Sequence, residues 1–254
     1  MSKKQQENLS KNGAANSFTE KDKNETKKAD KTAKQITEEI KNLVNGLNEL
    51  KIPGKKIIHI NKLKFSSIYS RLKKKTDYFE DYDEYTKHEG RGFEPDGGVL
   101  LLIDENENET NFTEWEPVFC CEMKRQGKKE NKDKNNCGNA IERGSKNIQG
   151  FEDACRGGEI FPYILFGWGY DFQKEYMHGK MSPMNHGGGY NKELLMNGHD
   201  GVMRATIYTK EEKWTECEML EKSLCMVKNV MRYYKNKKTA SNTPIKWIKN
   251  IFRK

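Results

Sequence analysis

Pro95-Asp96-Gly97-Gly98 stands directly before Val99-Leu100-Leu101-Leu102-Ile103, an apolar run that is typical of a buried β-strand. A second apolar run, Val118-Phe119-Cys120-Cys121, leads into Glu122-Met123-Lys124. The stretch between them is rich in Asn and Glu, which indicates a turn region. These residues predict a β-hairpin, and the two polar segments are expected to meet at one end of it.

The rest of the chain alternates between helical and strand-like patterns. Apolar residues at helical spacing mark four segments, 32–51, 66–75, 139–153 and 211–234. Short β-branched and aromatic runs mark three further strands, 57–60, 161–166 and 204–209. For the basic amphipathic segment 244–254, packing onto the domain is favoured over lying on a membrane. This order predicts an α/β domain with a mixed sheet.

Composition and charge bound the partners and the compartment. The 254 residues carry a formal net charge of +8, which suits a polyanionic partner, although Lys-rich tails alone can reach this charge. Residues 1–31 are polar and predict a disordered tail, which leaves 32–254 as a single domain. No apolar run approaches the roughly 20 residues that span a bilayer, and the six cysteines include no C-x-x-C pair. We expect a cytoplasmic protein with reduced thiols and no membrane partner.

Asp96, Glu122 and Lys124 are the candidate catalytic residues. Residues two apart in a strand share a face, so Glu122 and Lys124 point the same way and Met123 turns into the core. Two carboxylates offer the hard oxygen ligands that Mg²⁺ prefers, and a metal can neutralise charge that develops on a phosphate. The pattern predicts a Mg²⁺ site at Asp96 and Glu122. The alternative is a hairpin with a surface ion pair, because Glu-x-Lys recurs in this Lys- and Glu-rich chain.

Gly138-Asn139-Ala140-Ile141-Glu142-Arg143 stands at the start of the third predicted helix. Asn139 and Glu142 could form a capping box, which would serve the helix alone. At the end of a helix that faces DNA, however, Asn can bond adenine in a bidentate way and Arg can donate to base N7 or phosphate. Both interpretations fit the residues. The candidate DNA-binding residues are Gly138, Asn139, Ala140, Glu142 and Arg143.

Taken together, these motifs resemble EcoRI-type restriction endonucleases, a branch of the PD-(D/E)xK nuclease superfamily. The match continues through Gln126-Gly127, Lys146-Asn147-Ile148, 161–166 and 205–209. The resemblance implies that 32–254 form a single catalytic and DNA-binding nuclease domain. Its core would be restriction-endonuclease-like, with a mixed five-stranded sheet flanked by helices. It also implies a type II site-specific deoxyribonuclease that acts as a homodimer and cuts both strands of a palindromic duplex with Mg²⁺, leaving 5′ overhangs.

The resemblance also assigns roles to single residues. Asp96 and Glu122 would hold the metal, and Lys124 would orient the attacking water or stabilise the phosphate. Asn139, Ala140 and Arg143 would contact the central A·T pairs in the major groove. Glu142 would pair with Arg143 of the other subunit.

The implied recognition site has an AATT core, with GAATTC as the favoured full site. Residues 171–191 lack the closely spaced arginines that family members carry there, so the outer base pair is left open. A cognate DNA methyltransferase is the expected partner in the same bacterial cell.

Two other functions fit the same residues. One is a sequence-specific DNA-binding protein that has lost catalysis, and the other is a repair or phage nuclease on the same fold without site choice. The intact carboxylates and lysine favour an active nuclease. His178, His186 and His199 match no metal-binding spacing, so surface histidines are expected there.

Overall fold

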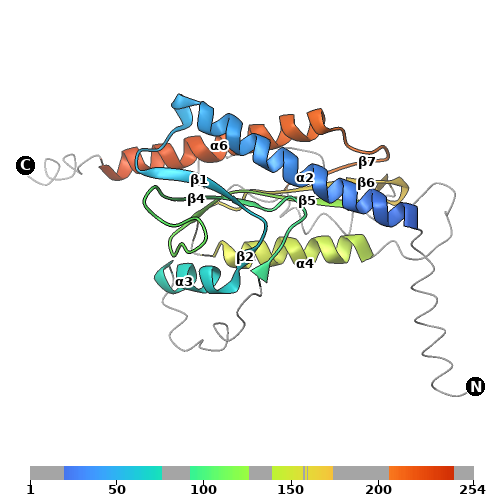
Figure 1. The fold of residues 1–254 in the computed structure, drawn as a ribbon, viewed down its shortest axis with the longest axis horizontal. Helices are drawn as coiled ribbons and strands as arrows, with labels where there is room; N and C mark the ends of the chain where they lie inside the picture. The colour runs from blue at the N-terminus through green and yellow to red at the C-terminus, as the bar shows by residue number, and fades with distance from the viewer. Residues whose placement is uncertain are drawn as a thin grey trace, which may run out of the picture.

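The protein is built around one mixed β-sheet. The computed structural model describes residues 20–75, 92–125, 139–156, 158, 160–173 and 206–242. The five strands lie in the order β1-β4-β5-β6-β7 (Figure 1). Their bounds are β1 Lys55–Ile60, β4 Val99–Asp104, β5 Glu116–Arg125, β6 Tyr163–Trp168 and β7 Thr206–Lys210. β1, β4 and β5 are antiparallel, whereas β6 and β7 run parallel to β5, which confirms the predicted mixed five-stranded sheet.

Helices cover both faces of this sheet (Figure 1). One face carries α2 (Glu20–Gly46) and α6 (Glu216–Asn242), and the other carries α3 (Phe65–Lys75) and α4 (Asn139–Ala154). The smaller elements are the 3₁₀ turns η1 (Asn48–Leu50) and η3 (Tyr170–Gln173) and the two-stranded sheet of β2 (Leu63–Lys64) and β3 (Gly92–Phe93). The flanking helices confirm the predicted fold class. None of the described helices is long and apolar enough to cross a bilayer.

The central strands are buried on both sides because successive side chains point to opposite faces. In β4, Leu100 and Leu102 pack toward α2 and α6, whereas Leu101 and Ile103 pack toward α4. Each such side chain contributes about 1.5–3 kcal/mol when it is fully buried. The continuous apolar run in the sequence therefore belongs to a strand between two helical layers.

Helix α2 begins earlier than the sequence pattern indicated. The predicted disordered tail, 1–31, overlaps this helix, which starts at Glu20 rather than at residue 32. Ala29 and Ala33 are fully buried and extend the stripe of Ile36 and Ile40 toward the N-terminus. These small side chains add little hydrophobicity to a Lys-rich segment, which is why composition favoured a tail. Residues 1–19 lie outside the described residues.

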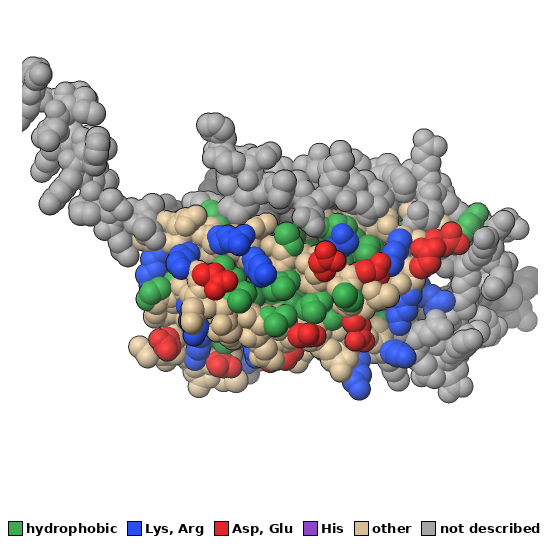
Figure 2. All heavy atoms as spheres, turned by 90° about the horizontal axis from the view of Figure 1, so that it is seen from above, with side chains coloured by type: hydrophobic (Ala, Val, Ile, Leu, Met, Phe, Trp, Pro, Cys, Tyr) green, Lys and Arg blue, Asp and Glu red, His purple; other side chains and the backbone are tan. Residues whose placement is uncertain are grey.

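The seam between α2 and α6 leaves some apolar surface open. Leu43 of α2 is 42% exposed, and Leu47, Leu220 and Leu224 are only partly buried. Figure 2 shows hydrophobic side chains along the middle of this face, with acidic and basic side chains among and around them. The basic amphipathic segment 244–254 lies outside the described residues. Its packing onto the domain stays a prediction.

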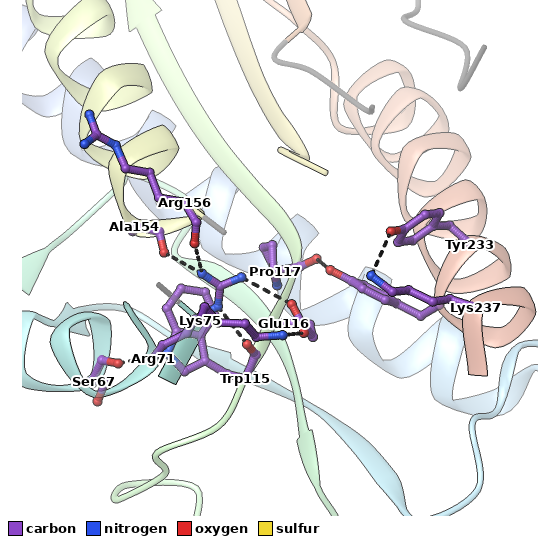
Figure 3. Close-up of polar contacts among 11 residues, drawn as sticks. Ser67, Arg71, Lys75, Trp115, Glu116, Pro117, Ala154, Arg156, Tyr233 and Lys237 are labelled. Atoms are coloured by element: carbon purple, nitrogen blue, oxygen red, sulfur yellow. Dashed lines mark hydrogen bonds and ion pairs between the residues drawn. The ribbon is translucent and has the colours of Figure 1, made fainter. Parts of the chain in front are cut away.

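Arg71 of α3 fixes the C-terminal end of α4 (Figure 3). Its Nη1 donates to the carbonyl oxygens of Ala154, at 3.1 Å, and Arg156, at 2.9 Å. Its Nε donates to the carbonyl of Trp115 at 3.0 Å, and Nη2 pairs with Glu116 at 3.3 Å. Because the Arg71 side chain is only 1% exposed, these acceptors replace water around the guanidinium. This contact holds α4 against the start of β5.

Candidate active site

The turn before β4 is tied to the end of β5. Gly98 N–H donates to the Pro95 carbonyl at 3.0 Å, and Gly97 N–H donates to the Cys121 carbonyl at 2.9 Å. Gly98 has a φ of +74°, a conformation that glycine adopts without strain. A Cβ on Gly97 would lie 2.7 Å from Cys121 Cβ. The two glycines therefore allow the turn to lie against β5.

This turn brings Asp96, Glu122 and Lys124 together, as the sequence predicted. Lys124 Nζ donates to Asp96 Oδ2 at 2.9 Å and also to Glu122 Oε1. The main chain connects the same groups, because Asp96 N–H donates to Glu122 Oε2 at 3.0 Å and Met123 N–H donates to Asp96 Oδ2 at 3.0 Å. Met123 is buried in the core, also as predicted. The two carboxylates and the ammonium thus face one another at one end of the hairpin.

Burial shapes the electrostatics of these three groups. Glu122 is fully buried, whereas the side chains of Asp96 and Lys124 are 22% and 15% exposed. Burial raises the pKa of Glu122 to about 7; the attraction of Lys124 opposes this rise and the charge of Asp96 adds to it. Burial alone would lower the pKa of Lys124, but Glu122 and Asp96 outweigh it and raise that pKa. Two acidic groups so close together favour a cation between them.

The donor set fits a small divalent cation. Asp96 and Glu122 present carboxylate oxygens on either side of the Lys124 ammonium. The two carboxylates therefore bind a positively charged group between them. Across the described residues, no three His, Cys, Asp or Glu side chains group as a metal site. Mg²⁺ commonly takes only one or two carboxylates and completes its shell with water and phosphate oxygens. A carboxylate pair is therefore sufficient for this ion.

Two residues near this site were not predicted from the sequence. Asn147 of α4 donates from Nδ2 to Glu122 Oε1 at 2.6 Å. Asp30 of α2 lies close enough to interact electrostatically with Asp96 and Lys124. Burial makes the largest contribution and raises the pKa of Asp30; the charge of Asp96 raises this pKa further, and the charge of Lys124 lowers it. Asp30 fell inside the predicted tail. Asn147 did carry a signal, because it interrupts an otherwise apolar helix face.

His59 of β1 holds the turn from its other side. Its Nε2 donates to the Gly97 carbonyl at 3.1 Å, and its Nδ1 lies 2.8 Å from Glu38 Oε2 on α2. Both neighbours are acceptor oxygens, so the ring makes both hydrogen bonds only when each nitrogen carries a proton. Strand β1 and helix α2 thereby both contribute to the placement of Asp96.

Comparison with known proteins adds an independent observation. A family model described as "Restriction endonuclease EcoRI" matches residues 13–186, more than half of the chain. The chain belongs to the EcoRI restriction endonuclease family. It is therefore a restriction endonuclease, which acts on double-stranded DNA. No curated protein sequence matches the chain. The matched span includes Asp96, Glu122, Lys124 and the whole of α4.

The predicted recognition segment of this family member is described only in part. Asn139 begins α4, which confirms a helix start at that residue. Gly138 lies outside the described residues, as do the side chains of Asn139, Ala140 and Glu142. The side chain of Arg143 is exposed on the first turns of α4. The capping box and the base contacts therefore both stay predictions.

Proposed function

We propose that this restriction endonuclease is a type II site-specific deoxyribonuclease that hydrolyses phosphodiester bonds in both strands of a palindromic duplex and leaves 5′ overhangs. Mg²⁺ is the proposed cofactor. The observation that carries the proposal is the convergence of Asp96, Glu122 and Lys124, in which one ammonium bonds both carboxylates. A surface ion pair would not require a fully buried glutamate, and Glu122 is fully buried.

Each residue of this cluster has a proposed role. Asp96 and Glu122 hold the metal, and the main-chain carbonyl of Met123 is proposed as a further oxygen ligand. When bound, Mg²⁺ supplies positive charge that offsets the charge developing on the phosphate. Lys124 orients the attacking water or stabilises the phosphate, and its raised pKa keeps it charged for that task. His59 and Gly97 keep Asp96 in reach of the other two groups.

Recognition is proposed to come from the N-terminal end of α4. Asn139, Ala140 and Arg143 contact the central A·T pairs of an AATT core, Gly138 lets the backbone approach, and Glu142 pairs with Arg143 of the second subunit. Each good bidentate base contact discriminates by about 1–3 kcal/mol. A homodimer would match its own two-fold symmetry to that of the site. GAATTC is the favoured full site, and a cognate methyltransferase would protect the DNA of the same bacterial cytoplasm.

Plasmid cleavage tests this proposal. The full chain is incubated with Mg²⁺ and either a plasmid that contains one GAATTC site or a copy in which that site is altered. We expect one linear product from the first plasmid only, and sequencing of its ends should show 5′ AATT overhangs. Discrete fragments of another sequence would change the site but keep the enzyme class. A smear would favour a nuclease without site choice, and binding without cleavage would favour an inactive DNA-binding protein.

A further inference from the structure

Asn147 occupies an unusual position on α4. The face of α4 that packs on the sheet consists of Gly144, Ile148, Phe151 and Ala154, which are all buried. Asn147 lies on the same face, three residues after Gly144 and four before Phe151, where spacing alone would favour an apolar side chain. Asn147 is partly buried there, and the part of its amide that leaves water is stabilised by a hydrogen-bond partner. Its partner is the buried carboxylate of Glu122.

The hydrogen bond from Asn147 restricts how Glu122 can lie. Glu122 Oε2 accepts the main-chain N–H of Asp96, and Oε1 accepts both Asn147 Nδ2, at 2.6 Å, and Lys124 Nζ. Asp96 and Lys124 belong to the same hairpin as Glu122, so they move with it. Among the residues that the structure describes, Asn147 is the donor that reaches this carboxylate from another element. It therefore couples the orientation of Glu122 to the position of α4.

Helix α4 is also the element that carries the proposed DNA-reading residues. Arg143 lies one turn before Asn147 and is exposed. At the other end, Arg71 donates to the carbonyl oxygens of Ala154 and Arg156 and anchors the C-terminal end of the helix. A displacement of α4 at Arg143 therefore also displaces Asn147, which lies one turn further along the same helix.

We propose that Asn147 is a positioning residue: it holds Glu122 in the orientation that binds the metal, and it makes this orientation depend on how α4 is seated on DNA. The proposal rests on the proposed function, since it concerns the same metal site. Asn147 acts through Glu122 and needs no contact with the reacting phosphate. Removal of such a supporting partner costs about 10- to 100-fold in metal affinity or activity in other metal sites.

Two variants of the full chain test the proposal. Asn147→Ala removes the amide, and Asn147→Asp keeps its shape but replaces the donor by an oxygen next to Glu122. Gln149→Ala is the matched control, because it removes an amide from an exposed position of the same helix. Thermal unfolding of all three variants is compared with that of the original chain, so that a loss of fold is recognised.

The readouts separate positioning from DNA binding. We measure single-turnover cleavage of a GAATTC duplex across a range of Mg²⁺ concentrations, and duplex affinity without a divalent cation. In both Asn147 variants the Mg²⁺ concentration for half-maximal rate should rise and the rate should fall by about 10- to 100-fold, while duplex affinity is unchanged. Gln149→Ala should behave like the original chain.

A second readout tests the coupling to α4. The hydrogen bond is present in the chain without DNA. If an incorrectly seated duplex displaces α4 and breaks this bond, loss of the bond by substitution should slow cleavage of GAATTC more than cleavage of a duplex altered at one base pair. The ratio of the GAATTC cleavage rate to the altered-duplex cleavage rate should then be smaller in Asn147→Ala than in the original chain.

The outcomes distinguish the two proposals. If the original chain cleaves GAATTC but the Asn147 variants keep its rate, its Mg²⁺ dependence and its rate ratio, the inference about Asn147 is wrong and the proposed function stands. If the variants lose duplex affinity in step with the cleavage rate, Asn147 is a DNA-binding residue and the positioning role is overturned. If the original chain cuts no DNA with Mg²⁺, the proposed function fails and the role of Asn147 falls with it.

Discussion

Glu122→Gln should increase the stability of the metal-free protein at high pH while it abolishes cleavage. The buried carboxylate is costly to ionise, because burial raises its pKa from 4.5 to about 7. Between those two values the folded protein binds more protons at this position than the unfolded chain does. The free energy of unfolding therefore falls as pH rises through this window and levels off above it. Glutamine keeps the shape of the protonated acid and has no charge to lose.

The size of the effect follows from the shift in pKa. A rise from 4.5 to about 7, at about 1.4 kcal/mol for each pKa unit, corresponds to about 3 kcal/mol. Between pH 4 and pH 8 the variant should therefore gain up to this amount of stability relative to the original chain. Added Mg²⁺ should stabilise the original chain relative to Glu122→Gln. An ion that binds only the folded state stabilises the protein that can hold it.

Urea unfolding of both proteins, followed by circular dichroism from about pH 4 to pH 8, measures this difference. Titrating groups that do not interact with Glu122 affect both proteins alike and cancel in the comparison. In a separate assay with Mg²⁺ and without urea, Glu122→Gln should cleave no GAATTC plasmid, whereas the original chain should cleave it. A stability difference that is the same at both ends of the pH range would refute the electrostatic account of Glu122, whatever its effect on cleavage.

Three further substitutions have distinct expected outcomes. Lys124→Ala should abolish cleavage but leave sequence-specific duplex binding in a gel-shift assay; full cleavage would exclude Lys124 from the mechanism. Gly97→Ala should cost about 1–3 kcal/mol in urea unfolding, because the new Cβ would overlap β5, whereas Gly46→Ala meets nothing within 4 Å and should change stability little. Arg71→Met should cost about 3 kcal/mol, because buried carbonyl groups lose their donor, whereas Arg156→Met, at a side chain that is 65% exposed, should have little effect. Gly97→Ala and Gly46→Ala should differ in their free energy of unfolding, and so should Arg71→Met and Arg156→Met. An equal loss of stability within either pair would contradict the difference in burial on which the expectation rests.

Local patterns were enough to predict the hairpin and the residues at its end. Val99 to Ile103 is apolar without interruption, so it had to lie between two layers, and the alternation around Met123 placed Glu122 and Lys124 on one face. The first residue of α4, Asn139, was also correct. In each case the deciding signal lay within a few neighbouring residues.

The missed features depend on contacts between distant segments. Asn147 and Glu122 are 25 residues apart, and only the packing of α4 on β5 makes them partners. Asp30 approaches the site because α2 extends to Glu20, and that extension depends on the burial of Ala29, which adds little hydrophobic signal. Tertiary packing, rather than local composition, decided these positions.

Binding of Mn²⁺, a spectroscopically visible substitute for Mg²⁺, tests most directly whether Asp96 and Glu122 form one metal site. Electron paramagnetic resonance of the chain with a GAATTC duplex should show bound Mn²⁺. Asp96→Asn and Glu122→Gln should each lose this binding. Glu114→Gln, which removes an exposed carboxylate paired with Lys74, should retain it. Undiminished Mn²⁺ binding in both Asp96→Asn and Glu122→Gln would show that the metal lies elsewhere and would contradict the proposed active site.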